Sequence, residues 1–231
     1  ALIFGLIGGK IYQVIQYEGI KDLPREILFF WAGGYVFFGA FIGGLIGVWL
    51  YLRRRNVPFL IAGDIAIPYV ALGHAIGRLG CFLNGCCWGD LCNFPWGVVY
   101  PQDSDIFDKQ VIRHLIPANA TMPLPVHPTP LYEIFGLIFI FFLLRMIYKN
   151  KLYNGQVLLW YFALYGAWRF FTENFRGDSY HTHFGMTASQ IVALSVCLLS
   201  TIVLIIMHFI VKNRNPYLPT EFISQTEKSV N

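Results

Sequence analysis

Charged residues are scarce in this sequence. Asp, Glu, Lys and Arg make up 13% of its 231 residues, against about 25% in a typical soluble domain. The apolar share is 56% and the mean hydropathy is +0.53. Several apolar runs also reach the roughly 20 residues that are needed to cross a bilayer. The scarcity of charge therefore excludes an ordinary soluble protein and predicts an all-α polytopic membrane protein.

One part of the chain lacks long apolar runs. Residues 84–130 are polar and contain seven prolines, which exclude a spanning helix. Six apolar runs flank this segment, at about 1–17, 27–52, 59–83, 131–148, 157–175 and 186–211. We therefore expect a single transmembrane domain over residues 1–231, with six transmembrane helices and a small head segment at 84–130.

Cationic residues end the second, fourth and sixth runs. They lie at 53–55, 149–151 and 212–214, and the positive-inside rule places these ends in the cytoplasm. The head segment is then periplasmic or interfacial, and residues 212–231 form a cytoplasmic tail. The net charge of +4 comes mainly from these helix ends, so we expect contact with membrane lipids and not with nucleic acid. Because the sequence begins inside an apolar run, we interpret its start as truncated, with a further helix upstream.

Ionisable residues in the apolar runs gather at the ends predicted to be periplasmic. They come from three runs and are His74, Arg78, Glu133, Tyr165, Arg169, Glu173 and Arg176. Charges inside a membrane protein usually face the bundle interior and pair with one another or with a substrate. Three arginines outnumber two glutamates, and this excess suits a phosphate, which guanidinium binds bidentately. The alternatives are that Arg176 snorkels to the headgroups and that Arg169 and Glu173 form a helix-surface ion pair.

The sequence has no CxxC pair, although four of its five cysteines lie within residues 81–92. Metal sites and thiol-redox sites usually pair cysteines in that way. We therefore expect no metal and no cofactor, and we expect one or two structural disulfides on an oxidising side of the membrane. A membrane thiol–disulfide oxidoreductase that uses the cysteines of 81–92 is the alternative.

Four segments resemble, in the same order, the motifs of one family. They are WAGGYVFFGAFIGG, GRLGCFLNGCCWG, HPTPLYE and YGAWRFFTENFRGD. They are similar to WxGGxxxxGGLIGG, GRxGNFxNGxxxG, HPxQLYE and YGxxRFxxExxRxPD of bacterial prolipoprotein diacylglyceryl transferase. The match covers most of the chain and is specific as a set. The sequence departs from the family pattern at Phe38, Cys81 and Pro130, where the family has histidine, asparagine and glutamine.

The resemblance implies a multi-pass enzyme of the bacterial inner membrane with seven helices, six of them in this chain. Such an enzyme transfers the diacylglyceryl group of phosphatidylglycerol to the lipobox cysteine of a prolipoprotein signal peptide. A thioether forms and glycerol phosphate leaves. By motif position, the resemblance implies functional roles for Arg78, Tyr165, Arg169 and Glu173. Gly89 closes the second motif, and Asn84 and Glu133 also match the family pattern.

The chemistry needs no nucleophile from the enzyme, because the substrate supplies the thiol. We expect Arg78 and Arg169 to clamp the phosphate and Glu173 to orient Arg169. The thiol must lose its proton, and the sequence does not choose among Glu133, His74 and Tyr165 as the group that assists. The residues expected to bind phosphatidylglycerol are Arg78, Asn84, Gly89, Arg169 and Arg176. A non-catalytic phospholipid-binding or transport protein with the same pocket is a further alternative.

Overall fold

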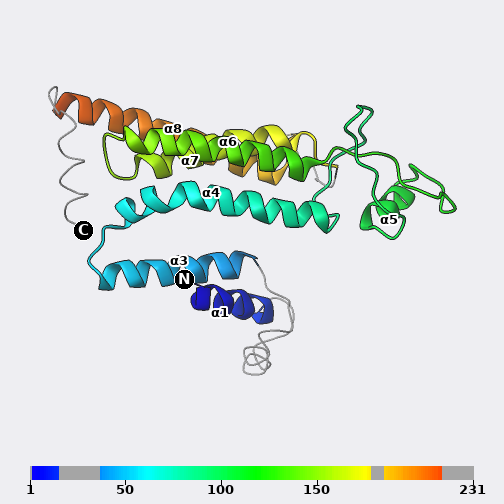
Figure 1. Cartoon of the computed structure of the whole chain (residues 1–231), viewed down its shortest axis with the longest axis horizontal. Coiled ribbons are helices and arrows are strands. Elements are labelled where there is room, and N and C mark those ends of the chain that lie inside the picture. The colour runs from blue at the N-terminus through cyan, green and yellow to red at the C-terminus, as the bar shows by residue number, and fades with distance from the viewer. Residues whose placement is uncertain (1, 16–36, 178–184, 215–231) are drawn as a thin grey trace. The chain divides into compact units, whose positions relative to one another are not determined.

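The structure is all-helical. This computed structural model describes residues 2–15, 37–177 and 185–214. Their helices are α1 (Leu2–Gln13), α3 (Phe37–Arg54), α4 (Phe59–Leu83), α5 (Asp105–Ile112), α6 (Thr129–Lys149), α7 (Gln156–Glu173) and α8 (Ala188–Arg214) (Figure 1). Over these residues, β-structure is limited to isolated bridges. The chain forms two compact units, Ala1–Ala62 and Gly63–Asn231.

In the first unit, α1 and α3 pack through their glycines. A Cβ atom added at Gly8 would overlap the carbonyl oxygen of Gly39 and would lie 3.0 Å from the Cα of Gly43. The two backbones can approach this closely only because these positions lack side chains. The expectation that the glycines of the second apolar run allow close helix packing is confirmed for the part of that run in α3.

Three of the described helices, α4, α6 and α8, are long and apolar enough to cross a membrane. The bounds of α4 are those expected from the sequence. The helices α1, α3 and α7 fall in the other three expected runs, with 12, 18 and 18 residues. The beginning of the second run and most of the expected tail lie outside the described residues. The structure thus supports a helical membrane protein, and the number of spans stays a prediction.

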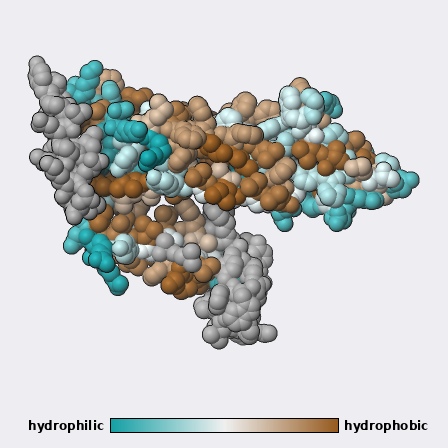
Figure 2. All heavy atoms as spheres, viewed as in Figure 1, coloured by the Kyte–Doolittle hydropathy of each residue, from teal (hydrophilic) through white to brown (hydrophobic). Residues whose placement is uncertain are grey.

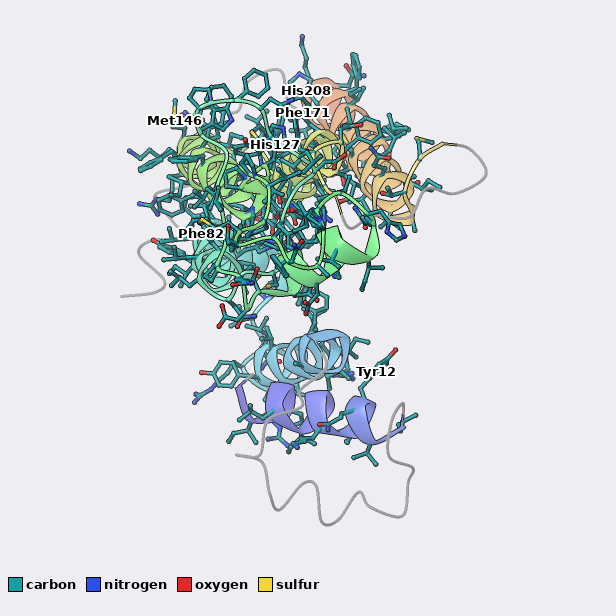
Figure 3. The ribbon with its side chains drawn as sticks, turned by 90° about the vertical axis from the view of Figure 1, so that its right-hand side faces the viewer. Tyr12, Phe82, His127, Met146, Phe171 and His208 are labelled. Atoms are coloured by element: carbon teal, nitrogen blue, oxygen red, sulfur yellow. The ribbon has the colours of Figure 1, made fainter. Side chains whose placement is uncertain are left out.

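The apolar side chains of the second unit are divided between a core and the outer surface of the helices. The core contains Ile67, Ala71, Leu137, Leu144 and Val157, which come from α4, α6 and α7. On the outside of α6, Phe135 and Phe139 are 69% and 64% exposed. Figure 2 shows apolar residues along these helices, and Figure 3 shows Met146 on the outer side of α6. An exposed apolar surface of this size marks contact with a membrane.

A buried carboxylate on α4 holds the beginning of α7. Asp64, which is 0% exposed, accepts hydrogen bonds from Gly155 N at 2.8 Å, Leu158 N at 3.1 Å and Lys151 Nζ at 3.1 Å. The first amides of a helix have no partner within it, and an anion there also interacts favourably with the helix dipole. Asp64 therefore acts as an N-cap supplied by another helix and joins α4 to α7 at the end of α4 opposite the head segment.

The head segment, residues 84–130, folds around α5 beyond the other end of α4 (Figure 1). Ser104 caps α5 by accepting a hydrogen bond from Phe107 N. The Gln110 amide makes two hydrogen bonds with the backbone of Leu124, at 3.0 and 2.7 Å. A small core consists of Trp88, Tyr100, Ile106 and Val126. The prolines thus exclude a spanning helix, as expected, and the segment instead forms a folded cap.

Candidate functional site

The buried carboxylate of Glu133 joins three helices. Its side chain, on α6, is 3% exposed. Arg78 of α4 places Nε 2.7 Å from Oε2, and Arg169 of α7 places Nη1 2.6 Å from Oε1. Each oxygen of the carboxylate therefore faces a different arginine. The expected convergence of charged residues from these three helices is confirmed.

A second carboxylate extends this cluster along α7. Arg169 Nη2 lies 2.5 Å from Glu173 Oε2, so one guanidinium bridges Glu133 and Glu173. Arg176 Nε lies 3.9 Å from the same Glu173 oxygen. The side chains of Arg169 and Glu173 are only 12% and 3% exposed. Their burial rules out the alternative of a helix-surface ion pair. We call Arg78, Glu133, Arg169, Glu173 and Arg176 the arginine cluster.

His74 and Tyr165 adjoin the arginine cluster. Tyr165 lies close enough to Arg78 for the two side chains to interact. The rings of His74 and Tyr165 meet edge to face, with centroids 5.0 Å apart. Tyr161 stacks on Tyr165 at 5.7 Å. All six residues that the sequence suggested for catalysis are thus linked through direct contacts.

The arginine cluster carries three positive and two negative side chains, so one positive charge is in excess among them. Guanidinium has five N–H donors in a planar fork, and the pair with Glu133 engages Nε of Arg78. Charge interactions are strong in a bundle of low dielectric constant. The arrangement therefore suits a phosphate between Arg78 and Arg169, whereas a metal cation would be repelled.

Gly89 lies where three segments meet through their backbones. Its amide donates to His127 O at 2.8 Å, and the next amide, of Asp90, donates to Phe175 O at 2.8 Å. A Cβ atom at Gly89 would lie 2.5 Å from Phe175 O. The absence of a side chain at Gly89 is thus required by the packing of the head segment against the ends of α6 and α7. In contrast, Asn84 is exposed just after the last residue of α4.

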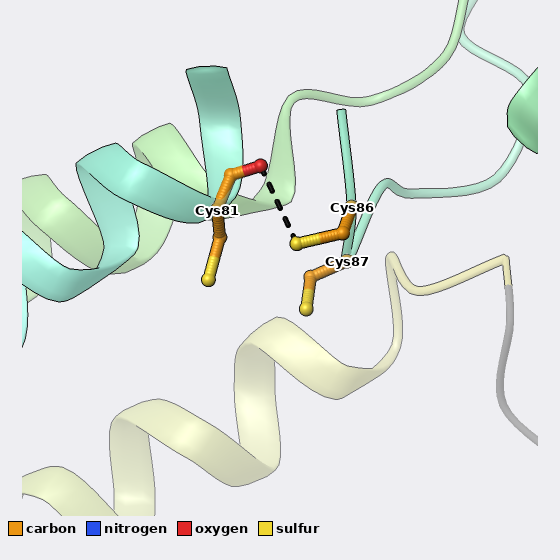
Figure 4. Close-up of side chains that lie close together, drawn as sticks. All are labelled: Cys81, Cys86 and Cys87. Carbon is orange, nitrogen blue, oxygen red and sulfur yellow. Dashed lines mark hydrogen bonds between the residues drawn. The ribbon is translucent and has the colours of Figure 1, made fainter. Parts of the chain in front are cut away.

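The cysteines are arranged differently from the expectation. All five are free thiols, so the disulfides expected in the head segment are not formed in the structure. Cys81, Cys86 and Cys87 lie together, with sulfur atoms all within 4.8 Å of one another (Figure 4). The spacing rule that argued against a metal site did not foresee this cluster of three thiols.

The sequence reasoning missed Thr187. Its hydroxyl donates to Glu173 Oε1 at 3.1 Å and accepts from Gln190 N at 3.1 Å. Gln190 Oε1 in turn accepts from Thr187 N at 2.9 Å. The sequence Thr-Ala-Ser-Gln before an apolar run is the signature of a capping box. That signal locates the start of α8, but it does not predict that the capping hydroxyl also contacts the arginine cluster.

The departures from the family pattern fall in three places. Pro130 lies in the first turn of α6, where proline is tolerated because the helix needs no amide there. Cys81 belongs to the group of three thiols. Phe38 lies in α3, and its side chain is outside the described part of the structure. Neither Pro130 nor Cys81 removes a charged residue from the arginine cluster.

Comparison with known proteins agrees with the geometry. The family model described as prolipoprotein diacylglyceryl transferase matches residues 1–206. Three similar proteins are each named phosphatidylglycerol–prolipoprotein diacylglyceryl transferase. The one from Clostridium tetani is 34% identical over 210 residues, which are 90% of this chain and 78% of the relative. The one from Finegoldia magna is 32% identical over 204 residues, covering 87% and 73%. The one from Clostridioides difficile is 34% identical over 180 residues, covering 78% and 64%.

The motifs of the arginine cluster lie inside the matched region. The match covers well over half of the chain, and the relatives are at least 30% identical over most of it. These three relatives are named as transferases, so the comparisons do not favour the thiol oxidoreductase alternative. This chain belongs to the prolipoprotein diacylglyceryl transferase family.

Proposed function

We propose that this chain transfers the diacylglyceryl group of phosphatidylglycerol to the cysteine thiol of a prolipoprotein. The single observation that carries this proposal is the sharing of Glu133 by Arg78 and Arg169, at 2.7 and 2.6 Å. The shared carboxylate holds two guanidinium groups from different helices side by side. One phosphate is the right size and charge to bind both of them.

The reaction replaces a carbon–oxygen bond with a carbon–sulfur bond. The thiolate of the lipobox cysteine attacks the diacylglyceryl carbon that bears the phosphate ester oxygen. The electron pair of the broken bond leaves with glycerol phosphate, which gains negative charge. Arg78 and Arg169 stabilise that charge as it develops, and Glu173 holds Arg169 in position. The enzyme therefore acts by orientation and electrostatics and needs no nucleophile of its own.

We assign the removal of the proton from the substrate thiol to the side of the site that holds His74 and Tyr165. Each oxygen of Glu133 is already paired with an arginine, at 2.7 and 2.6 Å, so its carboxylate is engaged. His74 contacts Tyr165, which contacts Arg78, so a proton taken there stays near the bound phosphate. Replacement of His74 by Asn is expected to lower kcat by about a hundredfold, as loss of a general base does, and to flatten the pH profile. An unchanged pH profile would exclude His74.

A groove on the outer surface of α6 and α7 is a candidate binding site for the acyl chains of the lipid. It has a volume of about 230 Å³ and is lined by apolar residues that include Phe139, Leu143 and Leu164. Its lining begins at Gly136, three residues after Glu133, and at Trp168, the residue before Arg169. An acyl chain in this groove would leave its phosphate at the level of the two arginines.

We place the enzyme in the bacterial inner membrane as a multi-pass protein with six spans in this chain. Cationic residues lie in the last turns of α3, α6 and α8, and these ends are assigned to the cytoplasm. The head segment at 84–130 then lies on the periplasmic side, where the prolipoprotein signal peptide presents its lipobox cysteine. Residues 1–231 form one membrane domain, and residues 212–231 are its cytoplasmic tail.

The proposal is tested by removing the arginines one at a time. Arg78→Ala and Arg169→Ala are assayed in membranes with phosphatidylglycerol and a lipobox peptide, and mass spectrometry follows the added diacylglyceryl group. Loss of either arginine is expected to lower the rate by about a hundredfold or more. Arg145→Ala is the matched control, because Arg145 lies on α6 but is exposed and donates to Tyr69. A rate within about threefold of wild type for both cluster variants would refute the clamp.

A further inference from the structure

The end of α4 brings Cys81 and Cys86 together. Cys86 N donates to Cys81 O at 3.0 Å, and Gly85 N donates to Phe82 O at 3.2 Å. This pair of bonds is the Schellman motif, which ends a helix with a residue in the left-handed conformation. Gly85 has that conformation, with φ of +67°. The motif folds the chain back over the last turn of the helix, so residues five apart become neighbours.

Cys87 completes a group of three thiols. It also has a positive φ, +60°, which is uncommon for a residue with a side chain. The three sulfur atoms lie within 4.8 Å of one another, and Cys86 Sγ lies 3.5 Å from Cys81 O (Figure 4). Sulfur atoms around a zinc ion, with Zn–S of about 2.3 Å, are about 3.8 Å apart. The group therefore needs to contract by no more than about 1 Å to surround an ion, within the reach of small side-chain rotations.

We propose that Cys81, Cys86 and Cys87 form a binding site for a thiophilic metal ion, of the class of Zn²⁺ and Cu⁺. Three thiolates satisfy three-coordinate Cu⁺, and they leave the fourth position of a tetrahedral Zn²⁺ to water. Each thiol releases its proton to solvent as its sulfur bonds to the ion, and no electron is transferred. The site would be distinct from the arginine cluster in both ligands and chemistry.

A buried hydroxyl beside these thiols is an independent sign of a missing partner. Tyr100 is 7% exposed, and its hydroxyl has no hydrogen-bond partner among the described residues. Its ring packs against the turn that ends α4, with Cδ1 3.5 Å from the position of a Cβ atom at Gly85, the residue before Cys86. A buried hydroxyl without a partner is costly. A metal-bound thiolate on Cys86 would be an acceptor for it, and such hydrogen bonds commonly support metal ligands.

The charges around the thiols also favour an occupied site. Cys87 lies within electrostatic range of Arg78, and a bare cation there would be repelled. Three thiolates with one Zn²⁺ carry a net charge of −1, so the assembled site attracts Arg78 instead. The backbone of Cys87 is held in place independently, because Thr129 Oγ1 donates to Cys87 O at 2.5 Å.

The test is a Cd²⁺ titration of the purified, reduced and chelator-treated protein in detergent, followed by thiolate-to-metal charge-transfer absorption. We expect the band to saturate at one Cd²⁺ per chain and to be displaced by Zn²⁺. Cys86→Ser should weaken binding more than about a hundredfold, and Tyr100→Phe by about tenfold. Cys197→Ser is the control, because Cys197 lies in α8 outside the group and its loss should leave the titration unchanged.

A second variant, Cys81→Asn, separates loss of a metal ligand from misfolding. Cys81→Asn installs the residue of the family pattern, so it should keep the fold while removing one ligand, and it should weaken Cd²⁺ binding as strongly as Cys86→Ser. The proposal is overturned if wild type shows no saturable band. It is equally overturned if the band survives unchanged in Cys81→Asn.

Discussion

Two buried carboxylates, Asp64 and Glu133, lie near the opposite ends of α4 and have different surroundings. Asp64 accepts from one lysine and two backbone amides. Glu133 forms ion pairs with two arginines that come from different helices. Both are almost inaccessible, at 0% and 2%. Burial of a charge therefore does not by itself indicate function in this protein.

The difference between the two ends lies in charge balance and in which groups donate. Asp64 and Lys151 cancel, and backbone amides, which cannot turn toward a ligand, supply the other donors. The arginine cluster keeps one positive charge in excess, on side chains with further N–H donors. A site that binds an anion needs such an excess, whereas a site that joins helices is most stable without it. Four predictions test this comparison.

The largest effect is expected from Glu133→Gln. Without the carboxylate, Arg78 and Arg169 repel each other and no longer hold one geometry, so the transfer rate should fall by about a hundredfold or more. The measurement is mass spectrometry of a lipobox peptide after incubation with phosphatidylglycerol. Asp64→Asn is the control and should retain near wild-type transfer, because asparagine still caps a helix. An equal loss of transfer rate in both variants would contradict the different roles assigned to Glu133 and Asp64.

Asp64→Ala should affect stability instead of chemistry. It leaves Lys151 and two amides without their acceptor, and breaking a buried ion pair costs about 3–5 kcal/mol. Denaturation in detergent should show this loss, while the folded fraction keeps its transfer rate. A stable variant with low activity would contradict the assignment of Asp64 to helix joining.

Thr187→Val should have a smaller effect. It removes the hydrogen bond to Glu173 and so loosens the group that positions Arg169. A hydrogen bond to a charged group contributes about 1.5–3 kcal/mol, and with partial compensation we expect about a tenfold loss of transfer rate. Thr187→Ser keeps the hydroxyl and should remain near wild type. If Ser and Val reduce the rate equally, the hydroxyl is not what matters at this position.

The smallest effect is expected in the pH dependence of alkylation of Cys86, one of the thiols near Arg78. Burial first, and then the neighbouring Cys87 and Cys81, raise the pKa of Cys86 from 9.0 to about 11. Only the thiolate reacts with alkylating agents, so the raised pKa makes Cys86 slow to react at neutral pH. Peptide-level mass spectrometry should show its alkylation rate, in metal-free protein, still rising between pH 9 and about pH 11. A plateau near pH 9 would show that the thiol is not shielded.

Local patterns allowed much of the fold to be predicted. The bounds of α4 follow from an apolar run between an Arg-rich stop with Pro58 and the turn residues Asn84 and Gly85. Such signals lie next to one another in the chain, so the sequence contains them directly. The helical period also placed Arg169 and Glu173 on one face of α7, since residues four apart are neighbours on any α-helix.

Contacts between helices were beyond such reasoning. The sequence suggested that Arg78, Glu133 and Arg169 lie at one level. It did not reveal that each oxygen of the Glu133 carboxylate pairs with a different arginine. It contained the capping box of Thr187 but not the bond from Thr187 to Glu173. Each of these contacts depends on the separation and rotation of packed helices, which no local pattern specifies.

The sequence by itself determined that this protein is helical and apolar, that it resembles its family, and which charged residues lie at the same level of three helices. The tertiary structure decided how those charges are paired, that Asp64 serves α7, and that three cysteines without a CxxC spacing form one group. The physical reason is that hydropathy and helical period act between chain neighbours. Ion pairs, tertiary caps and the return of the chain over the end of α4 depend on three-dimensional packing and on turn geometry.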